Sequence, residues 1–129
     1  TTYYNRHKFH ALVVTHEPGI GRALTILSCP GDWPDGALST PCNPTPIGDG
    51  PVDLRVTVDC ATQQFHWRQD GDDWQPIGPP LDASVISDEG GRGEHGSFTG
   101  AFVGMVAFDT SGAAATATFN HFTYTPDVS

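Results

Sequence analysis

Basic residues are scarce in this sequence. Of its 129 residues, six are Lys or Arg and fifteen are Asp or Glu, which gives a formal net charge of −9. A chain this acidic repels phosphate backbones, and its few cations are scattered, so we expect no nucleic-acid partner. Neutral ligands such as sugars are not disfavoured by this charge.

Long apolar runs and helical periodicity are also missing. No run reaches membrane-spanning length and no signal-peptide pattern opens the chain, so we expect a soluble protein with no membrane partner. No segment of helical length carries a periodic apolar stripe. Many short β-rich runs separated by Gly and Pro turns instead predict an all-β fold, an antiparallel β-sandwich that occupies residues 1–129 as a single domain.

Cysteine is rare, and the count is odd: Cys29, Cys42 and Cys60. Three cysteines are too few for a disulfide framework and leave at least one thiol unpaired, which favours the cytoplasm over secretion. One bridge between Cys29 and Cys42 stays open, but three buried or half-buried thiols are the favoured interpretation. No spacing matches a zinc site, and we expect no cofactor.

Alternation of apolar and polar residues places most of the strands. Residues 8–16 and 22–29 are joined by a short Pro/Gly segment and predict a hairpin. Residues 52–60 form the clearest strand, and the two runs that follow it predict a three-stranded meander. The Pro- and Gly-rich residues 30–51 predict a long loop.

The C-terminal half is less regular. Residues 81–89 fit either a short strand or one helical turn. Residues 99–109 are apolar on both faces and predict a buried central strand, and residues 116–124 predict the last strand. Between them, "GGRGEHGS" predicts a flexible loop, with Phe98 just beyond it on a glycine-flanked stretch.

Few residues carry obvious chemistry. Asp72 and Asp73 fall in a predicted turn, where Asp bonds to its own backbone. Asp88, Glu89 and Glu94 share a loop with His95 and could hold calcium, but solvated loop charges are the favoured interpretation. No nucleophile elbow, HExxH motif or phosphate loop occurs.

Aromatic side chains could stack on a sugar ring. Trp33 in the long loop is the best exposed candidate, whereas Trp67 and Trp74 flank a predicted hairpin turn and are expected to seal the core edge. These residues alone indicate an acidic β-sandwich with a capacity for sugar binding.

The order of segments adds a resemblance. "KFHALVVTHE", "RALTILSC", a long run containing "W-x-PIG-x-x-LDAS" and "SDE", then "FTGAFVG", and finally "ATFNHFTY" follow one another along nearly the whole chain. In this order the chain resembles the C-terminal concanavalin A-like β-sandwich of glycoside hydrolase family 43 β-xylosidases. In that family the sandwich follows a five-bladed propeller that holds the three acidic residues of an inverting mechanism. From this resemblance we expect the first strands of the family's sandwich to be missing from this sequence.

The resemblance implies an accessory function. The chain would be non-catalytic and would pack on a catalytic propeller, on the same or a separate chain, that acts on xylo-oligosaccharides or arabinofuranosides. A sandwich loop in the family contributes a phenylalanine to the substrate pocket, and "FTGAFVG" places that role on Phe98, with His95 and Arg92 as further candidates. Two alternatives remain, namely an independent lectin-like module that binds sugar through Trp33, and an oligomerising domain covered by another copy.

Overall fold

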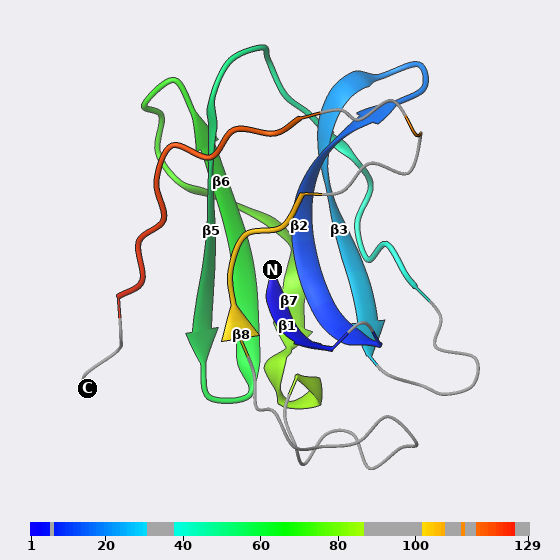
Figure 1. Cartoon of the computed structure of the whole chain (residues 1–129), viewed down its shortest axis with the longest axis vertical. Helices are drawn as coiled ribbons and strands as arrows, with labels where there is room; N and C mark the ends of the chain where they lie inside the picture. Colours follow the sequence, from blue (N-terminus) through cyan, green and yellow to red (C-terminus); the bar gives the residue numbers. More distant parts are fainter. Residues whose placement is uncertain (6, 31–37, 87–101, 108–111, 113–115, 126–129) are drawn as a thin grey trace.

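Two antiparallel sheets face each other in the computed structural model (Figure 1). The structure describes residues 1–5, 7–30, 38–86, 102–107, 112 and 116–125. Within these residues the strand order is β4-β3-β2-β1-β8 in one sheet and β5-β6-β7 in the other. None of the helical segments in this part of the chain is long and apolar enough to cross a membrane. The predicted all-β antiparallel sandwich is therefore confirmed.

The larger sheet is built on the predicted hairpin. Strands β2 (Lys8–Glu17) and β3 (Gly21–Pro30) pair along their whole length, and the turn between them contains the Pro and Gly that the sequence indicates. Strand β1 (Thr2–Asn5) pairs with β2, and the two-residue strands β4 (Thr45–Pro46) and β8 (Phe102–Val103) form the edges.

The smaller sheet is the predicted meander. It consists of β5 (Val52–Asp59), β6 (Thr62–Gln69) and β7 (Gln75–Asp82). Asp70 and Gly71 turn the chain between β6 and β7 with φ values of 59° and 75°, a left-handed conformation that Asp and Gly tolerate. Asp72 and Asp73 lie between these strands, as predicted, and the Asp72 amide donates to the Gln69 carbonyl at 3.1 Å.

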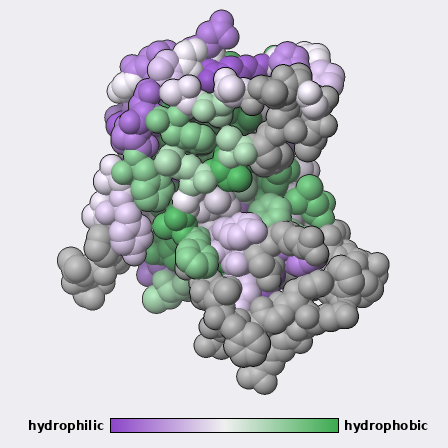
Figure 2. Space-filling view, in the orientation of Figure 1, coloured by the Kyte–Doolittle hydropathy of each residue, from purple (hydrophilic) through white to green (hydrophobic). Residues whose placement is uncertain are grey.

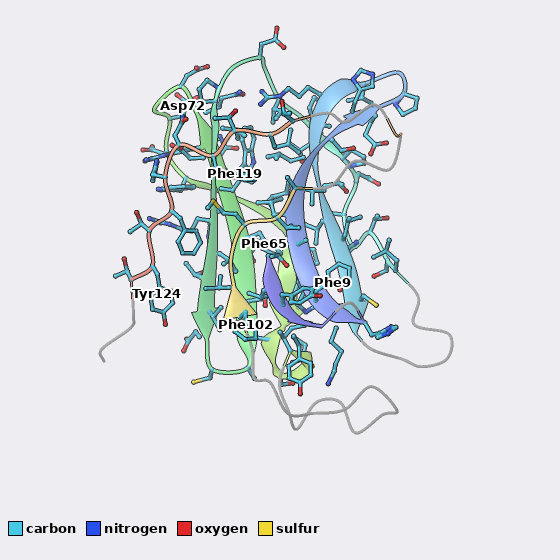
Figure 3. All side chains as sticks on the ribbon, in the orientation of Figure 1. Phe9, Phe65, Asp72, Phe102, Phe119 and Tyr124 are labelled. Atoms are coloured by element: carbon cyan, nitrogen blue, oxygen red, sulfur yellow. The ribbon has the colours of Figure 1, made fainter. Side chains whose placement is uncertain are left out.

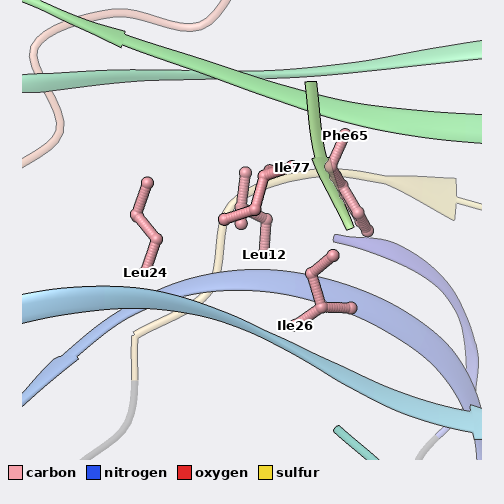
Figure 4. Close-up of a cluster of buried hydrophobic side chains, with 5 residues drawn as sticks. All are labelled: Leu12, Leu24, Ile26, Phe65 and Ile77. Carbon is pink, nitrogen blue, oxygen red and sulfur yellow. The ribbon is translucent and has the colours of Figure 1, made fainter. Parts of the chain in front are cut away.

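The core lies between the sheets and is small. Figure 4 shows the five residues of its central cluster, which all have 8% or less of their surface exposed: Leu12, Leu24, Ile26, Phe65 and Ile77. Leu12 and Ile26 are direct cross-strand neighbours, and Phe65 faces Ile77 in the other sheet. Burial of each side chain stabilises the fold by about 1.5–3 kcal/mol, so this cluster holds the two sheets together.

Two predicted strands are wrong where the structure describes them. Of the predicted central strand, only Phe102–Val103 is a strand, and it lies at the sheet edge with Phe102 59% exposed. β8 lies beside β1, which is four residues long, and pairs with two of its residues. Residues 116–124, predicted as the last strand, form none, because neither sheet offers them a partner strand among the described residues.

Smaller expectations are settled as well. Residues 83–85, left open as strand or helical turn, form the 3-10 helix η1 (Ala83–Val85). Cys29 is buried and Cys42 half-buried, but the expectation of a buried or half-buried thiol is wrong for Cys60, which is exposed because it lies in the turn between β5 and β6. All three are free thiols, so no bridge joins Cys29 to Cys42.

Candidate functional site

The predicted pocket residues Arg92, His95 and Phe98, and the predicted sugar-stacking residue Trp33, lie outside the described residues, so their roles stay predictions. The structure does describe the chain on both sides of residues 87–101, the segment that carries the first three. Helix η1 and Ile86 precede this segment, and β8 follows it.

The first end of the segment is fixed by a helix cap and by burial. The Asp82 carboxylate accepts hydrogen bonds from the Ser84 amide, at 2.9 Å, and from the Ser84 hydroxyl, so Asp82 caps η1. The Ala83 amide donates to the Ala61 carbonyl at 2.8 Å, and Ile86 is only 4% exposed. The residues that precede position 87 are therefore held against the sandwich.

The second end is fixed by strand pairing. Phe102 lies opposite Tyr3, and Val103 lies opposite Thr2. The Gly104 amide continues the attachment by donating to the Thr1 carbonyl at 3.0 Å. Tyr3 in turn stacks on Phe9 of β2, with 6.3 Å between the ring centroids, so this end is coupled to the centre of the larger sheet. Figure 3 shows Phe9 and Phe102 on opposite sides of β1.

Buried polar contacts join the two ends across the sandwich. The Thr2 hydroxyl donates to Gln63 Oε1 of β6 at 2.9 Å, and His10 Nε2 lies 3.0 Å from the Asp82 carbonyl. Thr2 and His10 are themselves cross-strand partners. We call Thr2, His10, Ser28, Gln63 and Asp82 the loop frame, because they hold both ends of residues 87–101 on neighbouring positions of β1 and β2.

His10 is the centre of the loop frame, and both of its ring nitrogens have partners. Its Nε2 lies 3.0 Å from a carbonyl oxygen and donates to it, and in the neutral imidazole Nδ1 then accepts from the Ser28 hydroxyl at 2.8 Å. Burial lowers the pKa of His10, and the nearby Asp82 carbonyl and carboxylate offset only part of this effect. Hydrogen bonds from Ser84 lower the pKa of the Asp82 carboxyl, and the bond from the hydroxyl has a larger effect than the bond from the amide.

One contact in the loop frame joins a hydroxyl to an imidazole. The Ser28–His10 contact could suggest an activated nucleophile, but only 7% of Ser28 and 3% of His10 is exposed, which leaves no room for a substrate. Nor do His, Cys, Asp and Glu side chains gather into a metal-binding group in the part of the chain that the structure describes. The loop frame thus joins residues on either side of residues 87–101 through buried hydrogen bonds.

A second polar cluster lies on the outer face of the smaller sheet. The Trp74 ring lies 4.3 Å from the Arg55 guanidinium and 4.4 Å from that of Arg68, and Arg68 also pairs with Asp53 at 2.9 Å. The expectation that Trp74 seals the core edge is wrong, because the two arginines draw it onto the outer face. Trp67 does pack against the core, as expected.

The model of the β-xylosidase C-terminal concanavalin A-like domain family matches residues 1–125. The chain belongs to this family. The crystal structure of xylan β-1,4-xylosidase from Bacillus halodurans C-125 superimposes with a TM-score of 0.78 at 30% identity, covering 87% of this chain and 21% of that one. The family resemblance seen in the segment order is therefore confirmed, and with it the concanavalin A-like sandwich.

The relatives that the chain matches are much longer than the chain itself. Xylosidase/arabinosidase 43B of Humicola insolens is 43% identical over 98% of the chain, which spans 24% of that protein. The β-xylosidase of Bacillus subtilis strain 168 is 35% identical over 95% of the chain, which spans 22% of it. The chain is thus similar to the C-terminal part of larger glycoside hydrolase family 43 proteins, and it spans about a quarter of their length.

The sequence did not single out the loop frame, although it carries a signal. His10 and Gln63 occupy the same alternating face of their strands as the core residues Leu12 and Phe65. A polar side chain at such a position is buried and needs a hydrogen-bond partner across the core. Polar residues at apolar positions of the strand pattern could therefore have been recognised as cross-sheet contacts.

Proposed function

We propose that this chain is the accessory β-sandwich of a xylan-degrading glycoside hydrolase, of the β-xylosidase or α-L-arabinofuranosidase type. It packs on a catalytic five-bladed propeller and helps to shape the pocket for short xylo-oligosaccharides. The carboxylates that cleave the glycosidic bond belong to the propeller, so this chain contributes binding rather than chemistry.

The loop frame is the observation that carries the proposal. Residues 87–101 lie between the buried Ile86 and β8. Before this segment, Asp82 bonds to His10, and after it, Val103 pairs with Thr2. Thr2 and His10 face each other in the sheet. A loop with both ends fixed this closely is positioned for contact with a neighbour at lower entropic cost than a loop on mobile ends. The names of the relatives, a xylosidase/arabinosidase and a β-xylosidase, indicate the class of substrate.

Phe98 is assigned the wall of the substrate pocket. A phenylalanine brought into a neighbouring pocket excludes water and offers an apolar surface to the carbon face of a pyranose ring. Arg92 and His95, on the same segment, are assigned to the surrounding contact with the propeller, where a guanidinium can pair with carboxylates.

The test uses the chain joined to its catalytic domain and measures xylose release from xylobiose. Phe98→Ala should lower kcat/KM by about tenfold to a hundredfold, the loss expected when one buried aromatic contact is removed from the bound state. Phe119→Ala is the matched control, because Phe119 lies in the C-terminal segment and is 48% exposed. Unchanged kinetics and unchanged inhibition by xylose in the Phe98 variant would show that the pocket role is wrong.

The lectin-like alternative has its own measurement. Calorimetric titration of the isolated chain with xylo-oligosaccharides should give no heat of binding if the pocket forms only with the propeller. Binding by the isolated chain that disappears in Trp33→Ala would favour an independent sugar-binding module instead.

A further inference from the structure

His10 is a titratable side chain inside the sandwich. Polar residues of this protein gather on its surface, for example around the upper end of the molecule in Figure 2, but only 3% of His10 is exposed. Its Nδ1 lies 2.8 Å from the Ser28 hydroxyl of β3, and its Nε2 lies 3.0 Å from the carbonyl of Asp82, the last residue of β7. The imidazole therefore links the larger sheet to the start of η1.

The charged groups that the described residues place around this imidazole favour its neutral form. Lys8 lies two residues away on the same face of β2 and is also 3% exposed, with its ammonium 4.1 Å from the Tyr4 ring centroid. From β7, Asp82 presents its carbonyl, whereas its carboxylate is exposed in the cap of η1. The other side chains of the loop frame do not titrate: Thr2 of β1, Ser28 of β3 and Gln63 of β6.

A proton on His10 therefore weakens the closed arrangement. Charging a buried imidazole costs solvation free energy, and a second buried cation beside Lys8 adds to that cost. In the cation both ring nitrogens donate, so the Ser28 hydroxyl can no longer donate to Nδ1 and must turn its proton away. Burial lowers the pKa of His10 for the same reason, and the Asp82 carboxylate offsets this effect only in part.

The element that His10 holds is short. η1 is three residues long, and apart from the Asp82 contact it is attached by the Ala83 amide, which donates to the Ala61 carbonyl at 2.8 Å, and by the burial of Ile86. Elements with few contacts open locally at a lower free energy than the whole fold. Losing one of these attachments therefore affects η1 before it affects the two sheets.

We propose that His10 is a pH-sensitive latch, which holds η1 against the larger sheet when it is neutral and lets η1 detach when it takes up a proton. Detachment exposes the imidazole to water, where its charged form is stable, so acid shifts the population toward the open state while both sheets stay folded. The latch acts within this chain and is independent of the accessory function proposed above.

Hydrogen exchange at pH 7 and pH 5 tests the latch, in the chain joined to its catalytic domain. With the intrinsic exchange rate at each pH divided out, the open fraction at Ala83 and Ile86 should rise by up to about tenfold for each pH unit below about 6.5, where a free histidine titrates. Low concentrations of urea should hardly change it, because local opening exposes little surface. The Asp82 carboxyl stays charged in this range, since Ser84 lowers its pKa further.

Two matched variants separate the latch from other effects of acid. His10→Gln keeps an amide donor for the Asp82 carbonyl but cannot be charged, so its open fraction should be the same at both pH values. His16→Gln changes an exposed histidine and should keep the full response. An open fraction that does not rise in the unaltered chain, a rise that survives in His10→Gln, or exchange at residues 83–86 that depends on urea as steeply as global unfolding does would overturn the latch.

Discussion

Gly78 offers the sharpest test of how the two sheets are joined. It lies in β7 with a φ of +71°, at the point where the pairing of β6 with β7 shifts register. A Cβ atom added there would lie 2.6 Å from Ile26 Cδ1 and 3.5 Å from Cys42 Sγ. Ile26 is fully buried in the core cluster, so it cannot move aside into solvent.

Two costs add in Gly78→Ala. Left-handed backbone in a residue with a Cβ costs about 1–2 kcal/mol. Overpacking against a fixed core side chain adds about 1–3 kcal/mol. The lower entropy of the unfolded alanine chain returns about 0.4–1 kcal/mol. We therefore expect Gly78→Ala to lower the free energy of unfolding by roughly 2–4 kcal/mol.

Urea denaturation with linear extrapolation measures this loss. Gly71→Ala is the matched control, because its φ of +75° is nearly the same but an added Cβ meets nothing within 4 Å. It should show the backbone cost alone. In the Gly78→Ala background, Ile26→Val removes the clashing Cδ1 atom and should cost less than the 0.5–1.5 kcal/mol that is usual for this change, or even stabilise. Equal losses at Gly71 and Gly78 would refute the close contact between β7 and β3.

Three further changes test other parts of the structure. Because burial lowers the pKa of His10 below its unfolded value of about 6.5, the protein should be most stable above that pH and lose stability as the pH drops below it. Urea denaturation at a series of pH values should show this loss in the control His16→Gln, since His16 is exposed, and should not show it in His10→Gln. Trp74→Ala should cost about 1–2 kcal/mol, because it removes two cation–π contacts, and a loss below a few tenths would show that the arginines do not hold the ring. Cys60→Gly should raise the free energy of unfolding by about 0.5–1 kcal/mol, because glycine adopts a φ of 54° without strain; a lower melting temperature would contradict this.

Strands with long regular alternation were predictable from the sequence. The β2–β3 hairpin and the β5–β6–β7 meander are local, since each strand pairs with its neighbour in the chain and turn residues mark the boundaries. Pattern and pairing therefore agree in these segments, and the structure follows the prediction.

Segments that depend on distant partners were not predictable. Residues 102–107 and 116–125 carry apolar side chains typical of strands, but pattern alone does not say whether a partner strand is within reach. Phe102 is accordingly exposed at an edge rather than buried in a central strand. Trp74 was misplaced for a similar reason, because its position is set by Arg55 and Arg68 on other strands.

The candidate site was only partly accessible to sequence reasoning. The family resemblance points to Phe98 through a short motif, whereas the loop frame arises from contacts between residues far apart in the chain, such as Thr2 with Gln63 and His10 with Asp82. Such contacts become visible only when both sheets are in place.

Xylose release from xylobiose, measured for the isolated chain, for the catalytic domain alone and for the two combined, tests the accessory role most directly. We predict no release by the isolated chain, and a kcat/KM for the combination that exceeds that of the catalytic domain and falls back toward it with Phe98→Ala. Cleavage by the 129-residue chain alone, or a catalytic domain indifferent to its presence, would contradict the account.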